Sequence, residues 1–243
     1  MARVLGVVAT KATHYDAYLV RSQHDLGAGW ESHRWGIATA SDDGWSMQRS
    51  VQTGVHGTPL YGAPSYAKSK ILLAHLRLVP ATSECVTQPQ PLRFGGWAFV
   101  HDGRPRDAHA RPGDEPETDV IFATLLHSLS ERGVLEGDPI GLADRAISDA
   151  VIALSSRAGT GSLNFLLSNG SLLYAFRFGR PLYQLIRNPI IGMPRHVAFA
   201  SEPLTRDPWS PIPDGTLIRA INRSEPPLRI AECRTSPSGG WVH

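Results

Sequence analysis

The sequence predicts an α+β protein in which two stacked antiparallel sheets are covered by helices. Strand-like segments come first, two helical segments follow, and strand-like segments fill the remainder of the chain. Strands and helices therefore do not alternate as they do in a doubly wound parallel sheet. The 243 residues contain no internal repeat and no Pro/Ser-rich linker, so residues 1–243 are predicted to form a single domain.

Strands dominate the first hundred residues. Residues 3–9 are apolar and β-branched, which indicates a buried strand that begins almost at the first residue and draws the terminus into the structure. A hairpin is expected where residues 34–40 and 45–51 flank Asp42-Asp43-Gly44, a strong turn signal. Two further strands are predicted over residues 70–79 and 96–100.

Helices are expected in the middle of the chain. The first lies within residues 114–132, where Thr118 is a candidate N-cap and Gly133 follows the last turn. The second spans residues 140–157, where apolar residues repeat with the helical period. Strands then return over residues 163–168, 172–178, 182–186, 197–200 and 216–221, and a surface strand and a loose end follow residue 224.

Composition and charge narrow the classes of function. The 24 basic and 22 acidic side chains are interleaved and leave a net charge of +2, so neither nucleic acid nor an anionic membrane is an expected partner. Cys85 and Cys233 form no CxxC pair and have no His spacing typical of a metal site, which favours a reduced, cytoplasmic protein. No apolar run reaches the length of a membrane span or of a secretory signal.

Seven short motifs occur in a fixed order between Met1 and about Ile221. They are Met1-Ala2-Arg3-Val4-Leu5-Gly6, His33-Arg34-Trp35-Gly36-Ile37-Ala38, Ala74-His75-Leu76-Arg77, Val100-His101-Asp102-Gly103, Pro116-Glu117-Thr118-Asp119, the octapeptide 163–170, and Ala200-Ser201-Glu202-Pro203-Leu204. In this order they resemble the class II glutamine amidotransferases, which belong to the N-terminal-nucleophile hydrolases. The resemblance implies a four-layer αββα sandwich.

The resemblance also implies a role for each matched position. In the family, a cysteine exposed by removal of the initiator methionine is the nucleophile, and its own α-amine is the base; the corresponding residue here is Ala2. The oxyanion hole, an Asn side chain and a Gly backbone N–H in the family, corresponds to Asp102 and Gly103. The implied substrate-binding positions are Arg77 for the α-carboxylate, Glu117 for the α-ammonium group, and Trp35 and Gly36 beside them.

Two of these roles are chemically lost. Ala2 carries no nucleophilic atom, and an ionised Asp102 accepts hydrogen bonds but cannot donate one to an oxyanion. Loss of a covalent nucleophile costs on the order of a millionfold in rate, and loss of an oxyanion donor costs roughly a hundredfold to a thousandfold. Another family segment, Asn-Thr-His-Pro-Phe, is also replaced here, by residues 86–91.

The sequence therefore favours a non-catalytic member that binds glutamine or a glutamate-like ligand and acts as a binding or assembly subunit. Family glutaminases often feed ammonia to a synthetase, so a synthetase or an active paralogue is the expected protein partner. No metal and no organic cofactor are expected. The alternative is an active hydrolase of glutamine or a γ-glutamyl amide in which Ala2 replaces a natural cysteine by engineering.

Structural interpretations of single residues remain open beside these. Arg77 lies in an apolar segment and is also compatible with a structural ion pair. His75 is compatible with a hydrogen-bonded core histidine, and His101 with a residue that only shapes a turn before Gly103. Cys85 has no partnered histidine in its loop, which is typical of an inert thiol rather than a replacement nucleophile.

Overall fold

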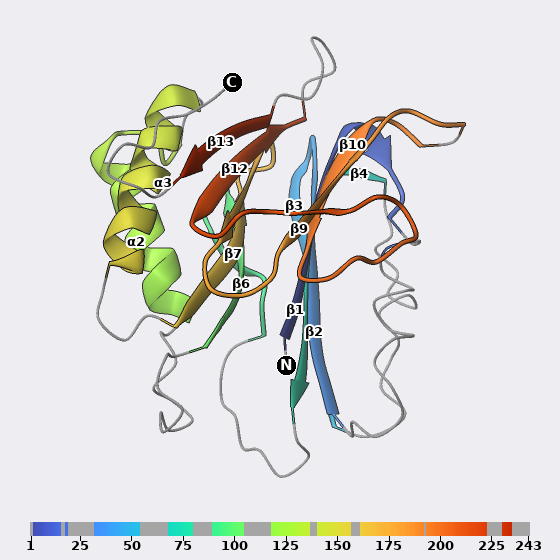
Figure 1. Cartoon of the computed structure of the whole chain (residues 1–243), viewed down its shortest axis with the longest axis horizontal. Coiled ribbons are helices and arrows are strands. Elements are labelled where there is room, and N and C mark those ends of the chain that lie inside the picture. The colour runs from blue at the N-terminus through green and yellow to red at the C-terminus, as the bar shows by residue number, and fades with distance from the viewer. Residues whose placement is uncertain are drawn as a thin grey trace.

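The computed structural model describes residues 2–15, 18, 32–53, 68–79, 89–104, 118–136, 140–156, 161–191, 193–222 and 230–234. Within these residues the chain forms two antiparallel sheets that face each other, with two helices on one outer side (Figure 1). This confirms the α+β fold class and the order of strands, two helices and strands. None of the helices in the described parts is long and apolar enough to cross a membrane.

The first sheet has seven strands in the order β11-β9-β10-β1-β4-β2-β3. Their bounds are β1 Ala2–Thr13, β2 Ser32–Ser41, β3 Gly44–Thr53, β4 Ser69–Val79, β9 Tyr183–Arg187, β10 His196–Ala200 and β11 Ser210–Pro211. The expected hairpin is confirmed, because β2 and β3 pair up to Ser41 and Gly44. Gly44 has φ 103, a conformation that favours glycine in such a turn. The N-terminal strand β1 lies between β4 and β10, so the start of the chain is built into the sheet.

The second sheet has six strands in the order β13-β12-β8-β7-β6-β5. Their bounds are β5 Leu92–Phe94, β6 Trp97–Arg104, β7 Ser162–Ser168, β8 Leu172–Arg177, β12 Thr216–Ile221 and β13 Ile230–Arg234. The expected turn after Val100 was wrong: β6 continues to Arg104, and Asp102 pairs with Asn164. The apolar run ends at His101, but β7 supplies backbone partners beyond that point, so the ladder continues through polar residues.

Helices α2 (Thr118–Glu131) and α3 (Ile140–Ser155) pack on each other and cover the six-stranded sheet (Figure 1). Buried residues of both helices share one core with the outward side of that sheet. Helix α2 begins at Thr118 and is followed by Gly133, which has φ 67, as a left-handed C-terminal residue requires. On the outer face of the seven-stranded sheet, Tyr18 is the described residue in helical conformation, and it packs into the core on that face.

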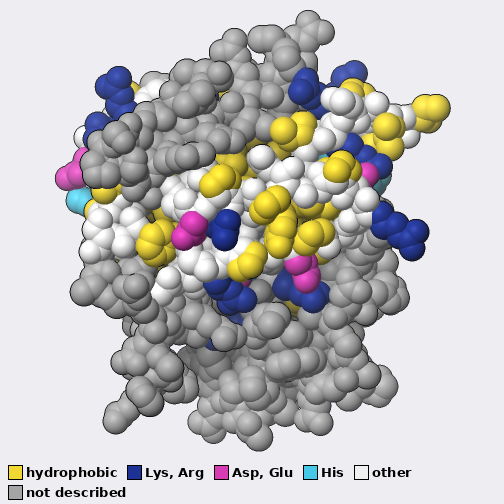
Figure 2. Space-filling view, in the orientation of Figure 1, with side chains coloured by type: hydrophobic (Ala, Val, Ile, Leu, Met, Phe, Trp, Pro, Cys, Tyr) yellow, Lys and Arg dark blue, Asp and Glu magenta, His cyan; other side chains and the backbone are white. Residues whose placement is uncertain are grey.

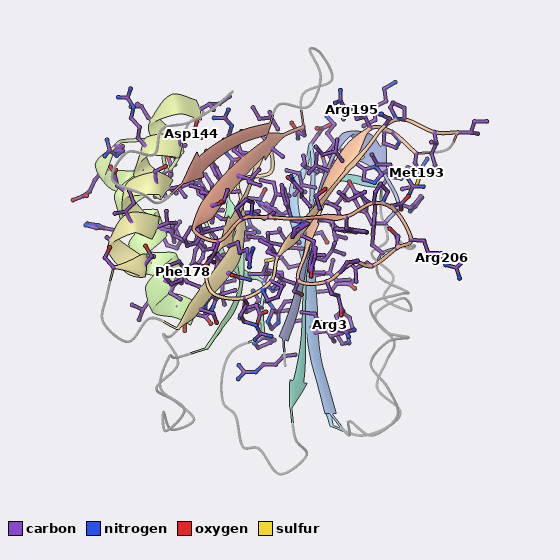
Figure 3. The ribbon with its side chains drawn as sticks, in the orientation of Figure 1. Arg3, Asp144, Phe178, Met193, Arg195 and Arg206 are labelled. Atoms are coloured by element: carbon purple, nitrogen blue, oxygen red, sulfur yellow. The ribbon has the colours of Figure 1, made fainter. Side chains whose placement is uncertain are left out.

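A second core fills the space between the sheets. It includes Val4 and Val8 of β1, Leu73 of β4, Val100 of β6 and Leu166 of β7. Alternate residues of the seven-stranded sheet form a third core on its other face, and Trp35 belongs to that one. Side chains crowd the layer between the sheets (Figure 3). On the face of the molecule in Figure 2, basic and acidic side chains are interleaved over the described part, in keeping with the small net charge.

Candidate functional site

Residue 2 and residue 77 lie side by side on neighbouring strands. Ala2 of β1 is paired in register with Arg77 of β4. The start of β1 is fixed on its other side, because the backbone N–H of Val4 donates to Ser201 Oγ at 3.1 Å. Arg3 also forms an ion pair with Glu202, with 2.6 Å between Arg3 Nε and Glu202 Oε1. The two positions that the sequence assigns to nucleophile and carboxylate clamp are therefore brought together by strand pairing.

The alternation of β4 places His75 and Arg77 on the side that faces the other sheet, because Ile71 and Leu73 belong to the core between the sheets. Burial, followed by Arg77 and His101, lowers the pKa of His75 to about 3. A histidine with such a pKa is neutral near pH 7. Arg77 is thus accompanied by an uncharged, buried imidazole.

Asp102 points into the same layer from the opposite sheet. It lies two residues beyond Val100, which belongs to the core between the sheets, and its residue is only 2% exposed. Its carboxylate is paired with Arg180, whose Nη1 lies 3.0 Å from Asp102 Oδ1. Burial of a carboxylate is costly unless a cation compensates it, and Arg180 provides that compensation.

Asn164 holds the turn that carries Arg180. Asn164 is fully buried and is the register partner of Asp102 on β7. Its Nδ2 donates to the carbonyl oxygens of Arg180 and Pro181, both at 3.1 Å. Its Oδ1 accepts from the backbone N–H of Phe178 at 2.8 Å, and Phe178 directly follows the last residue of β8 (Figure 3). One buried amide thus fixes the backbone on both sides of Arg180.

Gly103 is required by a close approach of His101 and β7. A Cβ at Gly103 would lie 2.2 Å from His101 Nε2 and 2.5 Å from the carbonyl oxygen of Ser162. His101 is 5% exposed, and its Nε2 has no hydrogen-bond partner among the described residues. Burial, followed by Arg77, lowers the pKa of His101 to about 4, so this histidine is also neutral near pH 7. His101 therefore occupies the space beside Gly103 without adding charge.

Gln90 connects the two sheets at this end. Its Oε1 accepts from the backbone N–H of His101 at 2.5 Å, and its Nε2 donates to the His101 carbonyl oxygen at 3.3 Å. Its own carbonyl oxygen lies 2.1 Å from where a Cβ of Gly36 would be. Gly36 of β2 is thus in contact with Gln90, whose side chain forms two hydrogen bonds with the backbone of His101 in β6.

Two predicted site residues are placed differently. The side chain of Trp35 is buried on the other face of the seven-stranded sheet, in the core that contains Leu5 and Val7. Glu117 lies outside the described residues, as do residues 114–116 of the expected first helix. The structure brings Ala2 next to Arg77, whereas Asp102 and Gly103 are consecutive residues of β6 on opposite faces of the strand, and Gln90 joins the two sheets beside them.

Sequence reasoning missed three residues of this end of the sandwich: Gln90, Asn164 and Arg180. Asn164 had a visible signal, since an amide within an apolar strand must find buried hydrogen-bond partners. Arg180 had none, because Asp102 lies 78 positions earlier in the chain. Among the parts of the chain that the structure describes, no three His, Cys, Asp or Glu side chains gather in a way that could hold a metal ion.

Comparison with known proteins identifies the family. Residues 29–195, more than half of the chain, match the family model described as "Glutamine amidotransferases class-II". The chain belongs to the class II glutamine amidotransferases. A curated relative, the γ-glutamyl-hercynylcysteine sulfoxide hydrolase of Mycobacterium tuberculosis, is 25% identical over 173 residues, which cover 68% of this chain and 67% of the relative.

Solved structures of amidotransferases share the fold. A class-II glutamine amidotransferase domain protein from Silicibacter pomeroyi matches with a TM-score of 0.59 and 20% identity, covering 97% of this chain and all (100%) of that chain. Glutamine phosphoribosylpyrophosphate amidotransferase from B. subtilis matches with a TM-score of 0.56 and 16% identity, covering 98% of this chain and 50% of that one. The two antiparallel sheets of this class II amidotransferase are therefore the fold that these solved structures share.

Proposed function

We propose that this class II amidotransferase is a non-catalytic member that binds glutamine or a glutamate-like amino acid in the cytoplasm, with residues 1–243 as one domain. The observation that carries the proposal is the state of Asp102. It occupies the family's oxyanion Asn position, is buried, and is held by Arg180. Ala2 at the nucleophile position supports the same conclusion independently.

The chemistry explains why each change abolishes a step. Amide hydrolysis in the family requires a thiolate that attacks the side-chain carbonyl carbon and a donor that stabilises the resulting oxyanion. The methyl group of Ala2 has no lone pair with which to attack. A carboxylate at position 102 offers only acceptors, so it cannot donate the hydrogen bond that the oxyanion requires. Neither defect would be repaired by correcting the other.

Binding can survive the loss of catalysis. Arg77 remains at the position of the carboxylate clamp, on the strand next to the start of the chain. Glu117 is proposed as the acceptor for an α-ammonium group, with one methylene more than the family's Asp. Gly36 and Gly103 allow the close packing of this end of the sandwich, because a side chain at either position would clash with Gln90 or His101. We propose that ligand binding requires neither a metal ion nor an organic cofactor.

We propose that a protein partner completes the function. The B. subtilis amidotransferase is about twice as long as the region that this chain matches, since the match covers 50% of it. A synthetase or an active paralogue would supply the chemistry that this chain lacks. Co-purification from the native source, followed by identification of the bound protein, tests the partner separately from the ligand.

Calorimetry tests ligand binding directly. L-Glutamine and L-glutamate are titrated into the full chain, and the same titrations are repeated with Arg77→Ala. Saturable binding of at least one ligand that is lost in Arg77→Ala supports the proposal. An absence of binding for both ligands would remove the ligand-binding function and leave only a scaffold.

The alternative function is an active hydrolase of glutamine or of a γ-glutamyl amide. It is favoured by the relative from M. tuberculosis, whose name describes a γ-glutamyl hydrolase and which is 25% identical to this chain. In that case Ala2 stands in place of a natural cysteine. The genomic codon for residue 2 distinguishes the two functions, because a cysteine codon would contradict the non-catalytic one.

A further inference from the structure

Arg180 places a positive charge next to Asp102, and none of the catalytic roles that the family resemblance implies accounts for it. It lies between β8 of one sheet and β9 of the other, and its side chain is 23% exposed, whereas that of Asp102 is 2% exposed. The carboxylate is therefore closed to solvent, and the guanidinium is partly open to it. A ligand from solvent can reach the guanidinium but not the buried carboxylate.

The guanidinium keeps hydrogen-bonding capacity for a ligand. An arginine side chain carries five N–H donors. Within the described residues, the only acceptor of the Arg180 side chain is Asp102 Oδ1, which Nη1 reaches at 3.0 Å. The backbone on both sides is fixed by Asn164, so the side chain starts from a rigid turn. A preorganised guanidinium with unused donors favours a planar, charged oxygen pair.

We propose that Arg180 binds the side-chain end of the ligand and makes the site selective for an amino dicarboxylate of glutamate length over glutamine. This inference rests on the proposed function, in which Arg77 takes the α-carboxylate from the other sheet. The side-chain end then faces the Asp102 position, next to Arg180.

Charge decides between the two ligand end groups. A carboxylate accepts two charge-assisted hydrogen bonds from the guanidinium fork, which are stronger than bonds to a neutral amide oxygen. His75 and His101 add no positive charge that could bind the ligand carboxylate, because burial keeps both side chains neutral near pH 7. The carboxamide of glutamine has a single, neutral acceptor oxygen, so it could not accept both hydrogen bonds of the guanidinium group.

The test compares the two ligands on the full chain by isothermal titration calorimetry. L-Glutamate is expected to bind about tenfold or more tightly than L-glutamine, which corresponds to one additional charge-assisted contact. The double variant Asp102→Asn/Arg180→Gln exchanges the ion pair for a neutral amide pair and removes both of its charges. It is expected to bind both ligands with nearly equal affinity.

Two further variants separate selectivity from folding. Arg180→Lys keeps the positive charge and the partner of Asp102 but loses the fork, and it is expected to reduce the preference severalfold. Arg187→Gln is the control, because it removes the ion pair of a similarly exposed arginine on β9, whose Nη1 lies 3.2 Å from Asp207 Oδ2. The preference should stay unchanged.

The possible results of these titrations distinguish a failure of the inference from a failure of the proposed function. Equal affinities in the unaltered protein, or a preference for glutamine, overturn the inference while the proposed function stands. A glutamate preference that persists in Asp102→Asn/Arg180→Gln and in Arg180→Lys also overturns it, since Arg180 would not be its source. If neither ligand binds the unaltered protein, the proposed function and this inference both fail.

Discussion

Asp102 and Arg180 form an ion pair at the end of the layer between the sheets, with Arg180 Nη1 donating to Asp102 Oδ1 at 3.0 Å. The carboxylate occupies a strand position, and the guanidinium comes from the crossover between the sheets. The charge of Asp102 is therefore balanced by a residue of the segment that connects the two sheets. Four predictions follow from this site and its surroundings.

Arg180→Ala is expected to lower the free energy of unfolding by about 3 kcal/mol, because it leaves the 2%-exposed Asp102 carboxylate without Arg180. Urea denaturation measures the change. Arg132→Ala is the control: its ion pair with Asp149 is exposed, with side chains 37% and 58% accessible, and its loss should cost at most about 0.5 kcal/mol. Equal losses in both variants would contradict the burial argument.

Gly103→Ala is expected to destabilise the protein by about 2–3 kcal/mol through overpacking, since its Cβ would lie 2.2 Å from His101 Nε2 and 2.5 Å from a backbone oxygen. Gly141→Ala is the matched control in α3, where an added Cβ meets nothing within 4 Å. There alanine should stabilise the protein by about 0.4–1 kcal/mol, because it lowers the conformational entropy of the unfolded chain. Thermal denaturation of the two variants should therefore shift in opposite directions.

The buried histidines predict that acid weakens the fold. Folding lowers the pKa of His75 to about 3 and that of His101 to about 4, from 6.5, so between these values the unfolded chain binds more protons. Stability is thus fully present above about pH 6.5 and falls as pH decreases toward the folded-state values. At pH 5 each histidine accounts for roughly 2 kcal/mol of the loss, from about 1.4 kcal/mol for each pH unit below 6.5.

Urea denaturation at a series of pH values measures this slope. His101→Gln should reduce the dependence of the unfolding free energy on pH by the contribution of one histidine. His127→Gln is the control, because His127 is a surface residue of α2 whose side chain is 74% exposed, and it should leave the slope unchanged. An unaltered slope in His101→Gln would contradict the assignment.

Restoring the nucleophile alone should not restore catalysis. Ala2→Cys is expected to give little ammonia release from glutamine, because Asp102 would still face the oxyanion without a donor. Addition of Asp102→Asn should raise the rate by roughly a hundredfold over Ala2→Cys, the typical contribution of one oxyanion donor. A fast Ala2→Cys single variant would show that Asp102 does not block the reaction.

Much of the fold could be predicted from the sequence because local patterns decide it. The apolar, β-branched start gave β1, the Asp42-Asp43-Gly44 turn gave the β2–β3 hairpin, and Gly133 marked the end of α2. The prediction failed at residues 101–104, where strand pairing with β7 continues although the apolar pattern has ended. Such an extension depends on a partner strand distant in sequence, which local patterns do not contain.

The sequence by itself determined the family resemblance, the loss of a nucleophile at Ala2 and the loss of a donor at Asp102, because these follow from the chemical nature of single side chains. Only the tertiary structure decided what surrounds them. It paired Ala2 with Arg77 across two strands, buried Trp35 on the opposite face, and joined Asp102 to an arginine 78 residues away. Contacts between distant segments arise when sheets pack, so no local pattern could have revealed that Arg180 stands at the site.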